Sequence, residues 1–367
     1  MFLKRTYFPV IIVGGGQAGL ALGHELTRAK SEFLILEAAS RIGESWRRRW
    51  DSLRLFSPAQ RSSLPGVTFP AEAHSFPTKD QVADYLVAYA QREHLPVQLN
   101  TKVLSLDRLG KRYLLTTDSK LFECDQVVIA TGAYQKPRVP SWAGDLDPEI
   151  VQIHAGGYKN PNQLAEGDVL VVGAGNTGAE IAIELAKAGH RVSLSGRDVG
   201  HVPQLFRRIG NGGLFWFLAT RVITLSTPIG RKLHESLRAG HGGPLVHIRA
   251  SQIASAGVER IGRVVGTRAG LPLLDDGRTL RVRNVIWCTG FGLDFSWVRL
   301  PIFAADGYPI HDRGRVTSAS GLYFLGLPFQ HSLSSTLIGG VGRDAKVLAK
   351  WILKHAPRNS LATDERG

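Results

Sequence analysis

Two glycine-rich segments of the same form constrain the fold of this 367-residue chain more than any other feature. The first, GGGQAG, spans residues 14–19, and the second, GAGNTG, spans residues 173–178. Each follows an apolar run, precedes an amphipathic helical pattern, and is followed by a second apolar run. This strand–turn–helix–strand order with a GxGxxG turn predicts a Rossmann-type dinucleotide-binding unit, and here it occurs twice.

The glycines of the motif have separate roles. Gly14 allows a tight turn, Gly16 allows the backbone to approach a pyrophosphate, and Gly19 allows the helix to pack closely on the strand. The helix N-terminus presents unpaired N–H groups to the pyrophosphate. The sequence therefore predicts that the following residues bind dinucleotide phosphates: Gly14, Gly16, Gln17, Ala18 and Gly19 in the first segment, and Gly173, Gly175 and Gly178 in the second.

The two units differ where their second strands end. The first ends in Glu37, 18 residues after Gly19, where a carboxylate accepts hydrogen bonds from ribose hydroxyls, as suits FAD. The second ends in Ser195, Gly196 and Arg197, and this lack of a carboxylate, together with the guanidinium, suits the 2′-phosphate of NADP. The alternative for Arg197 is an ordinary solvated loop arginine. A chain that binds FAD and NADPH moves hydride from nicotinamide to flavin.

The remaining pattern predicts an α/β fold in which the NADP-binding domain is inserted into a discontinuous FAD-binding domain. We expect the FAD-binding domain at 1–164 and 291–356, the NADP-binding domain at 165–290, and a disordered tail at 357–367. Helices are expected at 80–93, 179–188 and 343–355, and short strands at 103–106, 113–116, 121–124 and 322–326. Buried strands that end in Ala130, Thr131 and Gly132, and in Thr289 and Gly290, are expected to close the two domains against their cofactors.

One stretch, 204–244, does not fit the dinucleotide pattern. It holds six Arg or Lys residues, the single acid Glu235, and the aromatic run Phe215, Trp216 and Phe217. Three interpretations stay open: a lid over the substrate cavity, a peripheral contact with a membrane surface, and an ordinary insertion with one buried face.

Composition narrows the class of protein. The net charge is +14, but no helix-turn-helix, RNA-binding or zinc-finger signature accompanies it, so we expect no nucleic-acid partner. No apolar run is long enough to span a membrane and no signal peptide is visible, so we expect a cytoplasmic protein. Cys124 and Cys288 provide neither a disulfide framework nor a CxxC pair, and no metal site is expected. The sequence gives no indication of the oligomeric state.

The chain resembles the class B flavin-containing monooxygenases over nearly its whole length, especially the short bacterial members and the plant auxin-synthesising ones. The motifs that carry the resemblance are VIIVGGGQAGLA, LILEAASRIGESWRRRWDSLRLFSPA, FPTKDQVADYLVAYA, ATGAYQKPRVP, VVGAGNTGAEIA, VIWCTGF and LYFLGLPF. The resemblance implies that Trp46 lies at the flavin, that 53–58 lines the pocket at its reactive edge, and that Asn176 and Thr177 meet the NADP pyrophosphate. It also implies that Thr336 and Leu337 close over the isoalloxazine ring. Candidate pocket residues are Phe56, Ser57, Gln330 and His331.

The resemblance further implies an NADPH- and FAD-dependent monooxygenase that oxygenates a soft nucleophile or a ketone, with dioxygen, through a C4a-peroxyflavin. Two departures from the family pattern bear on this step. His154 and Tyr158 keep the second half of the family fingerprint, but its first half is replaced by Pro148 and Ile150, and Phe56 stands where many members have Asn. Two rival functions therefore stay open: an NADPH-dependent flavin reductase or oxidase without oxygen insertion, and an FAD- and NADPH-binding redox sensor.

Overall fold

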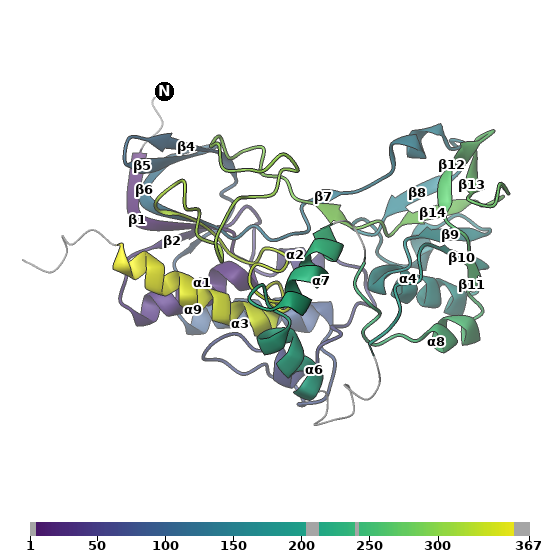
Figure 1. Cartoon of the computed structure of the whole chain (residues 1–367), viewed down its shortest axis with the longest axis horizontal. Coiled ribbons are helices and arrows are strands. Elements are labelled where there is room, and N and C mark those ends of the chain that lie inside the picture. The colour runs from purple at the N-terminus through teal and green to yellow at the C-terminus, as the bar shows by residue number, and fades with distance from the viewer. Residues whose placement is uncertain (1–4, 203–212, 239–241, 356–367) are drawn as a thin grey trace, which may run out of the picture.

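Two sheets of mainly parallel strands organise the chain into two α/β units that lie side by side (Figure 1). The computed structural model describes residues 5–202, 213–238 and 242–355. Each unit contains one of the two glycine-rich turns, as the sequence predicts. The fold class is confirmed.

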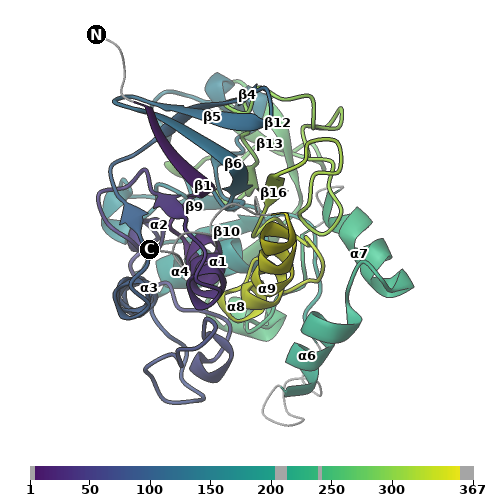
Figure 2. The same cartoon turned by 90° about the vertical axis from the view of Figure 1, so that its left-hand side faces the viewer.

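The first unit is built on a seven-stranded sheet with the order β3-β2-β1-β6-β5-β4 and β16 beside β6. Its strands are β1 (Arg5–Val13), β2 (Leu34–Leu36), β3 (Val97–Gln98), β4 (Val103–Leu109), β5 (Arg112–Thr117), β6 (Leu121–Ile129) and β16 (Leu322–Phe324). The helices α1 (Gln17–Arg28), α3 (Lys79–Arg92) and α9 (Ile338–Lys354) accompany it, with α1 and α9 adjacent (Figure 2). Two strands expected near 121–132 form one continuous strand, β6. The polar break at Asp125 is an outward-facing position whose carboxylate accepts a 2.6 Å hydrogen bond from the Tyr7 hydroxyl.

Helix α9 begins five residues earlier than the sequence predicted. Its first turn contains Gly339 and Gly340, which are poor helix formers and hid the start of the helix. Close packing requires both glycines. A Cβ would lie 1.9 Å from the Arg61 carbonyl oxygen at Gly339 and 2.0 Å from the Ser334 carbonyl oxygen at Gly340.

The second unit is built on a five-stranded parallel sheet with the order β11-β10-β9-β14-β8. Its strands are β8 (Val151–His154), β9 (Val169–Val172), β10 (Val192–Ser195), β11 (Glu259–Ile261) and β14 (Asn284–Trp287). Helices α4 (Asn176–Lys187) and α8 (Ala250–Ser255) and the hairpin of β12 (Val264–Arg268) and β13 (Leu271–Leu274) complete it. Strand β8 belongs to this sheet although it precedes the expected boundary at residue 165.

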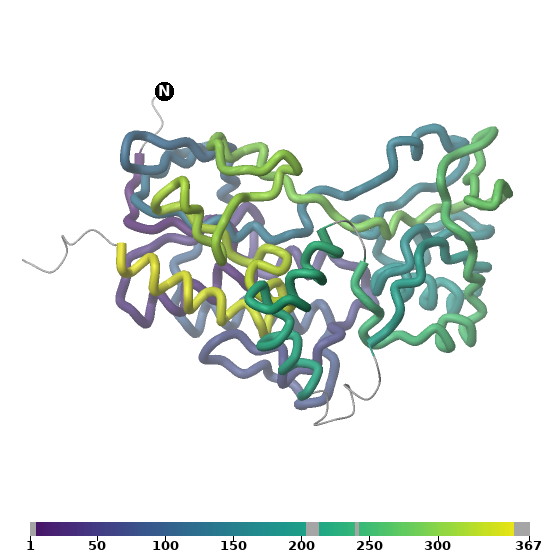
Figure 3. The backbone as a smooth tube through the Cα atoms, viewed as in Figure 1, coloured from purple at the N-terminus to yellow at the C-terminus, as the bar shows by residue number. Residues whose placement is uncertain are grey.

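Two chain segments cross between the units. They pair as the short antiparallel strands β7 (Lys136–Pro137) and β15 (Phe291–Gly292), and the tube in Figure 3 shows both crossings. The segment after the short helix α2 (Glu44–Arg47) also joins the units, because Trp50 and Leu53 pack in the apolar core of the second unit with Tyr158. The Asp51 N–H donates to the Lys159 carbonyl at 2.8 Å.

Part of the basic insertion lies against the first unit rather than the second. It comprises α6 (Gly213–Phe217), the π-helical turn η4 (Leu218–Val222) and α7 (Pro228–Arg238), and Figure 2 shows α6 and α7 at one side of the body. The Leu225 N–H donates to the His331 carbonyl at 2.8 Å, and the Leu333 N–H donates to the Ile223 carbonyl at 3.1 Å. The rest of the insertion at 204–212 and 239–241, and the expected tail at 357–367, fall outside the described residues.

Across residues 5–202, 213–238 and 242–355, every helix is too short or too polar to traverse a lipid bilayer.

Candidate cofactor and substrate site

The first glycine-rich turn has the geometry that a bound dinucleotide requires. Gly14 has a φ of +114°, and a Cβ there would lie 2.6 Å from the Ala130 carbonyl oxygen at the end of β6. A Cβ on Gly19 would lie 1.9 Å from the Gly14 carbonyl oxygen. At Gly16, by contrast, a Cβ would meet no described protein atom within 4 Å. Backbone atoms therefore pack closely against the turn at Gly14 and Gly19, whereas the space at Gly16, at the N-terminus of α1, is open.

The second turn repeats this geometry position by position. Gly173 has a φ of +111°, and a Cβ there would lie 2.3 Å from the Cys288 carbonyl oxygen after β14. A Cβ on Gly178 would lie 1.8 Å from the Gly173 carbonyl oxygen, and around Gly175 the described chain again leaves 4 Å of open space. In both turns the unpaired N–H groups of a helix N-terminus face that open space. The residues present thus fit two dinucleotides.

Glu37 lies at the carboxyl end of β2, beside the first turn. One carboxylate oxygen accepts from the Gly15 N–H at 2.7 Å and the other from the Ala39 N–H at 2.8 Å. These two bonds fix the carboxylate at the rim of the turn. A carboxylate has about four acceptor positions, so it retains capacity for ribose hydroxyls.

Ser195 and Arg197, which the sequence assigned to the second ribose, lie in different surroundings. Ser195 is 1% exposed; its hydroxyl donates to the Gly262 carbonyl at 2.9 Å and accepts from the Val264 N–H at 3.0 Å. This hydroxyl therefore joins β10 to the segment after β11 instead of facing a ligand. Arg197 is exposed beyond the strand end, and Arg260 reaches the same place, donating to the Gly196 carbonyl at 3.2 Å. The Arg260 guanidinium, rather than the Ser195 hydroxyl, thus lies at the exposed end of β10.

Gln17, predicted at the dinucleotide phosphates, connects two residues that the family resemblance assigns to the flavin, Trp46 and Thr336. The Trp46 indole N–H donates to the Gln17 side-chain oxygen at 3.4 Å, and the Gln17 amide donates to the Thr336 carbonyl at 3.3 Å. Gln17 stands in the first turn of α1, and Thr336 directly precedes α9. These contacts lie beside the open space at Gly16, which we call the first cofactor groove; the open space at Gly175 is the second.

The four candidate pocket residues lie in two segments of the chain, Phe56 and Ser57 in one and Gln330 and His331 in the other. Ser57 is buried and its hydroxyl lies 2.9 Å from that of Ser62, while Phe56 is half-buried. Gln330 is fully buried; its amide accepts from the Leu327 N–H and donates to the Arg313 carbonyl, each at 3.3 Å. The Gln330 side chain is therefore committed within the protein and does not line a pocket, which corrects the expectation for it. His331 is buried, and burial lowers the pKa of its imidazole.

The crossing between the units holds an aromatic and cationic cluster. The Arg49 guanidinium lies 4.9 Å from the centre of the Tyr134 ring and 5.3 Å from that of Phe291. His154, from the end of β8, packs edge-on against Phe291 at 4.8 Å. The His154 Nδ1 accepts from the Gly156 N–H at 3.0 Å, so Nε2 carries the proton and donates to the Gly290 carbonyl at 3.0 Å. Burial lowers the pKa of His154, which keeps this structural tautomer neutral.

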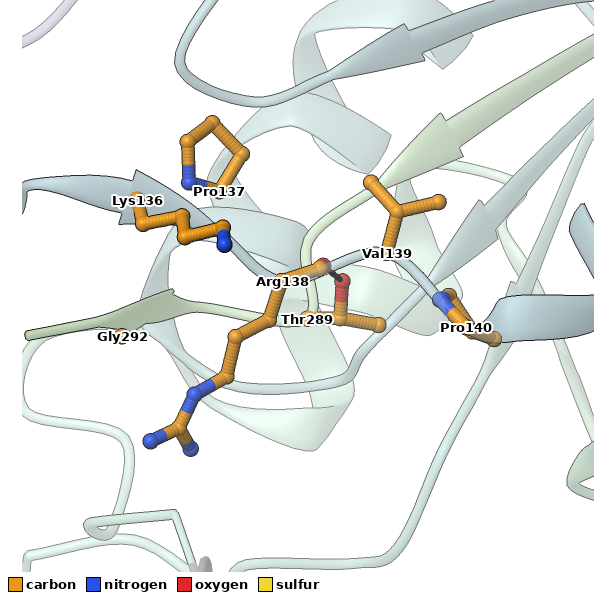
Figure 4. Close-up of a pocket in the computed structure, with 7 residues that line it drawn as sticks. All are labelled: Lys136, Pro137, Arg138, Val139, Pro140, Thr289 and Gly292. Atoms are coloured by element: carbon orange, nitrogen blue, oxygen red, sulfur yellow. Dashed lines mark hydrogen bonds between the residues drawn. The ribbon is translucent and has the colours of Figure 1, made fainter. Parts of the chain in front are cut away.

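A cavity of about 530 Å³ opens beside this crossing. Figure 4 shows Lys136, Arg138 and Thr289 among its lining residues, with the Thr289 hydroxyl donating to the Arg138 carbonyl. Thr289 and Gly290 follow β14, whose end supports the second turn. The cavity therefore presents two cations next to the second cofactor groove, a feature that scattered basic residues in the sequence did not reveal.

The helix behind the second turn contains a perturbed carboxyl. Desolvation, with the nearby charge of Glu184, raises the pKa of Glu180 to about 8. The His247 Nε2 lies 3.3 Å from the Glu180 carboxyl. Desolvation also raises the pKa of the Cys288 thiol to about 12, so this cysteine is protonated at neutral pH.

Asn176, expected at the pyrophosphate, accepts from the Val246 N–H at 2.9 Å and donates to the Pro244 carbonyl at 3.2 Å, which holds that loop beside the turn. Thr177 lies next to it in the first turn of α4.

A family model described as pyridine nucleotide-disulphide oxidoreductase matches residues 11–203. An uncharacterized CzcO-like oxidoreductase of Geobacillus kaustophilus is 41% identical over 94% of this chain and 98% of its own length. The probable indole-3-pyruvate monooxygenase YUCCA3 of Arabidopsis thaliana is 31% identical over 82% of this chain and 77% of its own. The solved structure of a flavin-containing monooxygenase from Stenotrophomonas maltophilia superposes with a TM-score of 0.76 at 25% identity and covers 96% of this chain and 99% of that one.

Proposed function

Because this chain belongs to the pyridine nucleotide-disulphide oxidoreductase family and, within it, to the class B flavin monooxygenases, we propose that it uses NADPH, in preference to NADH, to oxygenate a small organic substrate. FAD and NADPH are the cofactors that this membership implies. The observation that carries the proposal is the pair of glycine turns, each packed from behind and open at its middle glycine. When bound, FAD accepts hydride from NADPH and activates dioxygen.

The chain's own contribution is binding, orientation and the exclusion of water. The first turn and Glu37 would hold FAD, with Trp46, Gln17 and Thr336 at one end of its groove. The second turn would hold the pyridine nucleotide, with Arg197 beside the ribose. The crossing cluster of Arg49, Tyr134 and Phe291 would fix the angle between the two grooves. Excluding water from the space between them favours transfer of oxygen to a substrate over its loss as peroxide.

A disulfide reductase is the less favoured function. Such enzymes attack disulfides with thiolates, whereas Cys124 is fully buried and the Cys288 thiol has a pKa near 12. An NADPH oxidase stays as the rival, since Phe56 replaces a hydrogen-bonding side chain found in many relatives.

The decisive experiment supplies purified holoenzyme with NADPH, ¹⁸O₂ and a neutral sulfide such as thioanisole. A monooxygenase gives a sulfoxide that carries one ¹⁸O atom, and the same reaction in H₂¹⁸O under ordinary dioxygen gives unlabelled sulfoxide. If sulfides, ketones and amines all return unchanged while peroxide forms in proportion to NADPH, the oxidase is the correct assignment. If NADPH is not consumed in air, the redox sensor is.

A further inference from the structure

A second cavity, of about 520 Å³, lies where the basic insertion meets the first unit. Its walls come from the 3₁₀ turn η1 (Ala59–Arg61) and the residues after it, from the first turns of α9, and from α6 and η4. The lining residues are Gln60, Arg61, Ser63, Gly213, Trp216, Phe217, Thr220, Arg221, Gly339 and Arg343.

Three guanidinium groups converge on this cavity, one from each wall. Arg61 comes from the first unit, Arg221 from the π-helical turn, and Arg343 from α9. The lining includes no Asp or Glu. Over the described ranges, no carboxylate lies within 4 Å of any of the three guanidinium groups. The cavity therefore carries a concentrated positive charge that the protein does not neutralise at contact distance.

One of the three guanidinium groups, that of Arg343, is partly removed from water, whereas Arg61 and Arg221 are exposed. Arg343 is half-buried, and its guanidinium donates to the Thr220 carbonyl. Burial, and next the positive charge of Arg221, lower the pKa of Arg343. Asp344, the one described carboxylate that acts favourably on Arg343, is itself buried on the core side of α9. Repulsion between the half-buried Arg343 and the exposed Arg221 favours an anionic ligand that would relieve it.

The rest of the lining is suited to an organic anion. Trp216 is 8% exposed and Phe217 57% exposed, so the insertion offers an indole and a phenyl ring beside the guanidinium groups. Gln60, Ser63 and Thr220 add polar atoms. Guanidinium groups bind carboxylates through paired, charge-assisted hydrogen bonds, and the rings suit an apolar body attached to the carboxylate.

The cavity shares walls with the segments assigned to the flavin. Gly339 stands three residues after Thr336, and its Cα packs on the Arg61 carbonyl, where a Cβ would approach to 1.9 Å. Ser62, which follows Arg61, shares a 2.9 Å hydrogen bond between hydroxyl groups with Ser57, a candidate pocket residue. A ligand held by the arginines thus lies next to the segments that border the first cofactor groove.

We propose that this cavity binds the carboxylate of the substrate, so that the enzyme acts on organic acids with an apolar body. This inference rests on the proposed monooxygenase function and names its substrate class. The carboxylate lies between Arg61, Arg221 and Arg343, and the apolar part lies against Trp216 and Phe217.

The test compares an acid with its own neutral ester. (Phenylthio)acetate and methyl (phenylthio)acetate carry the same oxidisable sulfur and the same phenyl ring. With holoenzyme, the KM of the acid should be at least about tenfold below that of the ester, as charge-assisted contacts imply. Arg221→Gln and Arg61→Gln should each reduce this acid-to-ester preference about tenfold or more. Arg231→Gln, an exposed arginine of α7 outside the lining, is the matched control and should keep the wild-type preference.

Calorimetric titration of the holoenzyme with the acid gives a readout that does not depend on turnover. Binding that is weakened by Arg221→Gln but not by Arg231→Gln supports the inference even if no sulfoxide forms. Equal affinity for acid and ester, or inorganic phosphate binding as tightly as the acid, overturns it. Oxygenation of thioanisole without any acid preference refutes the substrate class alone, whereas failure to oxygenate sulfides, ketones and amines alike refutes the proposed function.

Discussion

The three glycines of each turn are needed for different reasons, and only one of them is needed for the ligand. At Gly14 and Gly19 an added Cβ would collide with backbone at 2.6 and 1.9 Å, so the fold itself requires glycine there. At Gly16 an added Cβ would meet no described atom beyond its chain neighbours within 4 Å, so the protein alone would accept a side chain. Gly175 repeats this in the second turn. The two middle glycines can therefore be changed with little effect on folding.

This difference predicts the behaviour of Gly16→Val and Gly175→Val. Both variants should fold, with wild-type far-ultraviolet circular dichroism. Gly16→Val should purify without flavin absorbance, because the valine occupies the pyrophosphate position. Gly175→Val should stay yellow but show a KM for NADPH raised at least about tenfold, a loss of about 1.4 kcal/mol. Gly19→Val is the contrasting control and should yield little soluble protein. A fully yellow Gly16→Val would refute the FAD assignment of the first turn.

Arg197 and Ser195 allow a second comparison at the residue scale. Arg197→Ala should raise the KM for NADPH about tenfold or more and leave that for NADH nearly unchanged, because a charge-assisted bond to a phosphate contributes about 1.5–3 kcal/mol. Ser195→Ala should instead lower the free energy of unfolding by about 1–3 kcal/mol, since its buried hydroxyl bonds Gly262 and Val264, without changing the NADPH-to-NADH ratio. Steady-state kinetics with both nucleotides and urea unfolding measure the two effects. An equal loss of NADH affinity in Arg197→Ala would make that arginine structural.

At the scale of single elements, α4 carries a half-buried carboxyl, that of Glu180, whose pKa is strongly raised. Glu180 has a pKa of about 8 in the folded protein against an ordinary value of 4.5. Below about pH 4.5 the carboxyl is protonated in both folded and unfolded states, so it does not lower the free energy of unfolding. As the pH rises towards 8, the unfolded carboxyl ionises while the folded one does not, so stability falls across this window.

Glu180→Gln should remove that part of the pH dependence. Each unit of pKa shift corresponds to about 1.4 kcal/mol. Between pH 5 and pH 8 the free energy of unfolding should therefore fall further in the wild type than in the variant, by at least about 1 kcal/mol. Urea unfolding of the holoenzyme at several pH values measures it. Glu32→Gln, which changes an exposed carboxylate of the first unit, should keep the wild-type pH profile. Parallel profiles for wild type and Glu180→Gln would show that His247 pairs with an ionised Glu180.

Elements with strong local signals were predictable, and those fixed by packing were not. The βαβ pattern around each glycine turn is local in sequence, and so is the spacing of the apolar residues Val82, Tyr85, Leu86 and Tyr89, which α3 buries; these elements were therefore predictable. Helix α9 was placed late because Gly339 and Gly340 hide its first turn, and its start depends on contacts with Arg61 and Ser334. Ser195 was misjudged for the same reason, since Gly262 and Val264, which occupy its hydroxyl, are remote in sequence. The three arginines of the second cavity come from three separate segments, so no spacing rule could group them.

At the scale of the whole molecule, the two units are joined by more than the paired crossing strands. The insertion leaves the second unit in sequence, yet it bonds to the first unit at 331–333, between the end of β16 and the start of α9 (Figures 1 and 2). This contact, with the crossing strands β7 and β15, restrains the separation of the two cofactor grooves. If the restraint serves to exclude water, loosening it should change the ratio of sulfoxide to peroxide and leave NADPH oxidation nearly unchanged.

Leu225→Pro tests this restraint directly. Proline lacks the N–H that donates to the His331 carbonyl at 2.8 Å, whereas Leu225→Ala removes more of the side chain than proline does and keeps that bond. We expect the proline variant to bind FAD and oxidise NADPH with a KM within about twofold of wild type, because neither glycine turn is touched. Its peroxide yield per NADPH should rise at least about twofold over that of the alanine variant, with a matching fall in sulfoxide, because water reaches the space between the grooves more readily. Peroxide and sulfoxide measured in the same reaction give the partition. Equal partition in the two variants would show that the insertion positions the arginine cavity without sealing the reaction from water, and the exclusion of water would then have to come from the crossing cluster at Arg49.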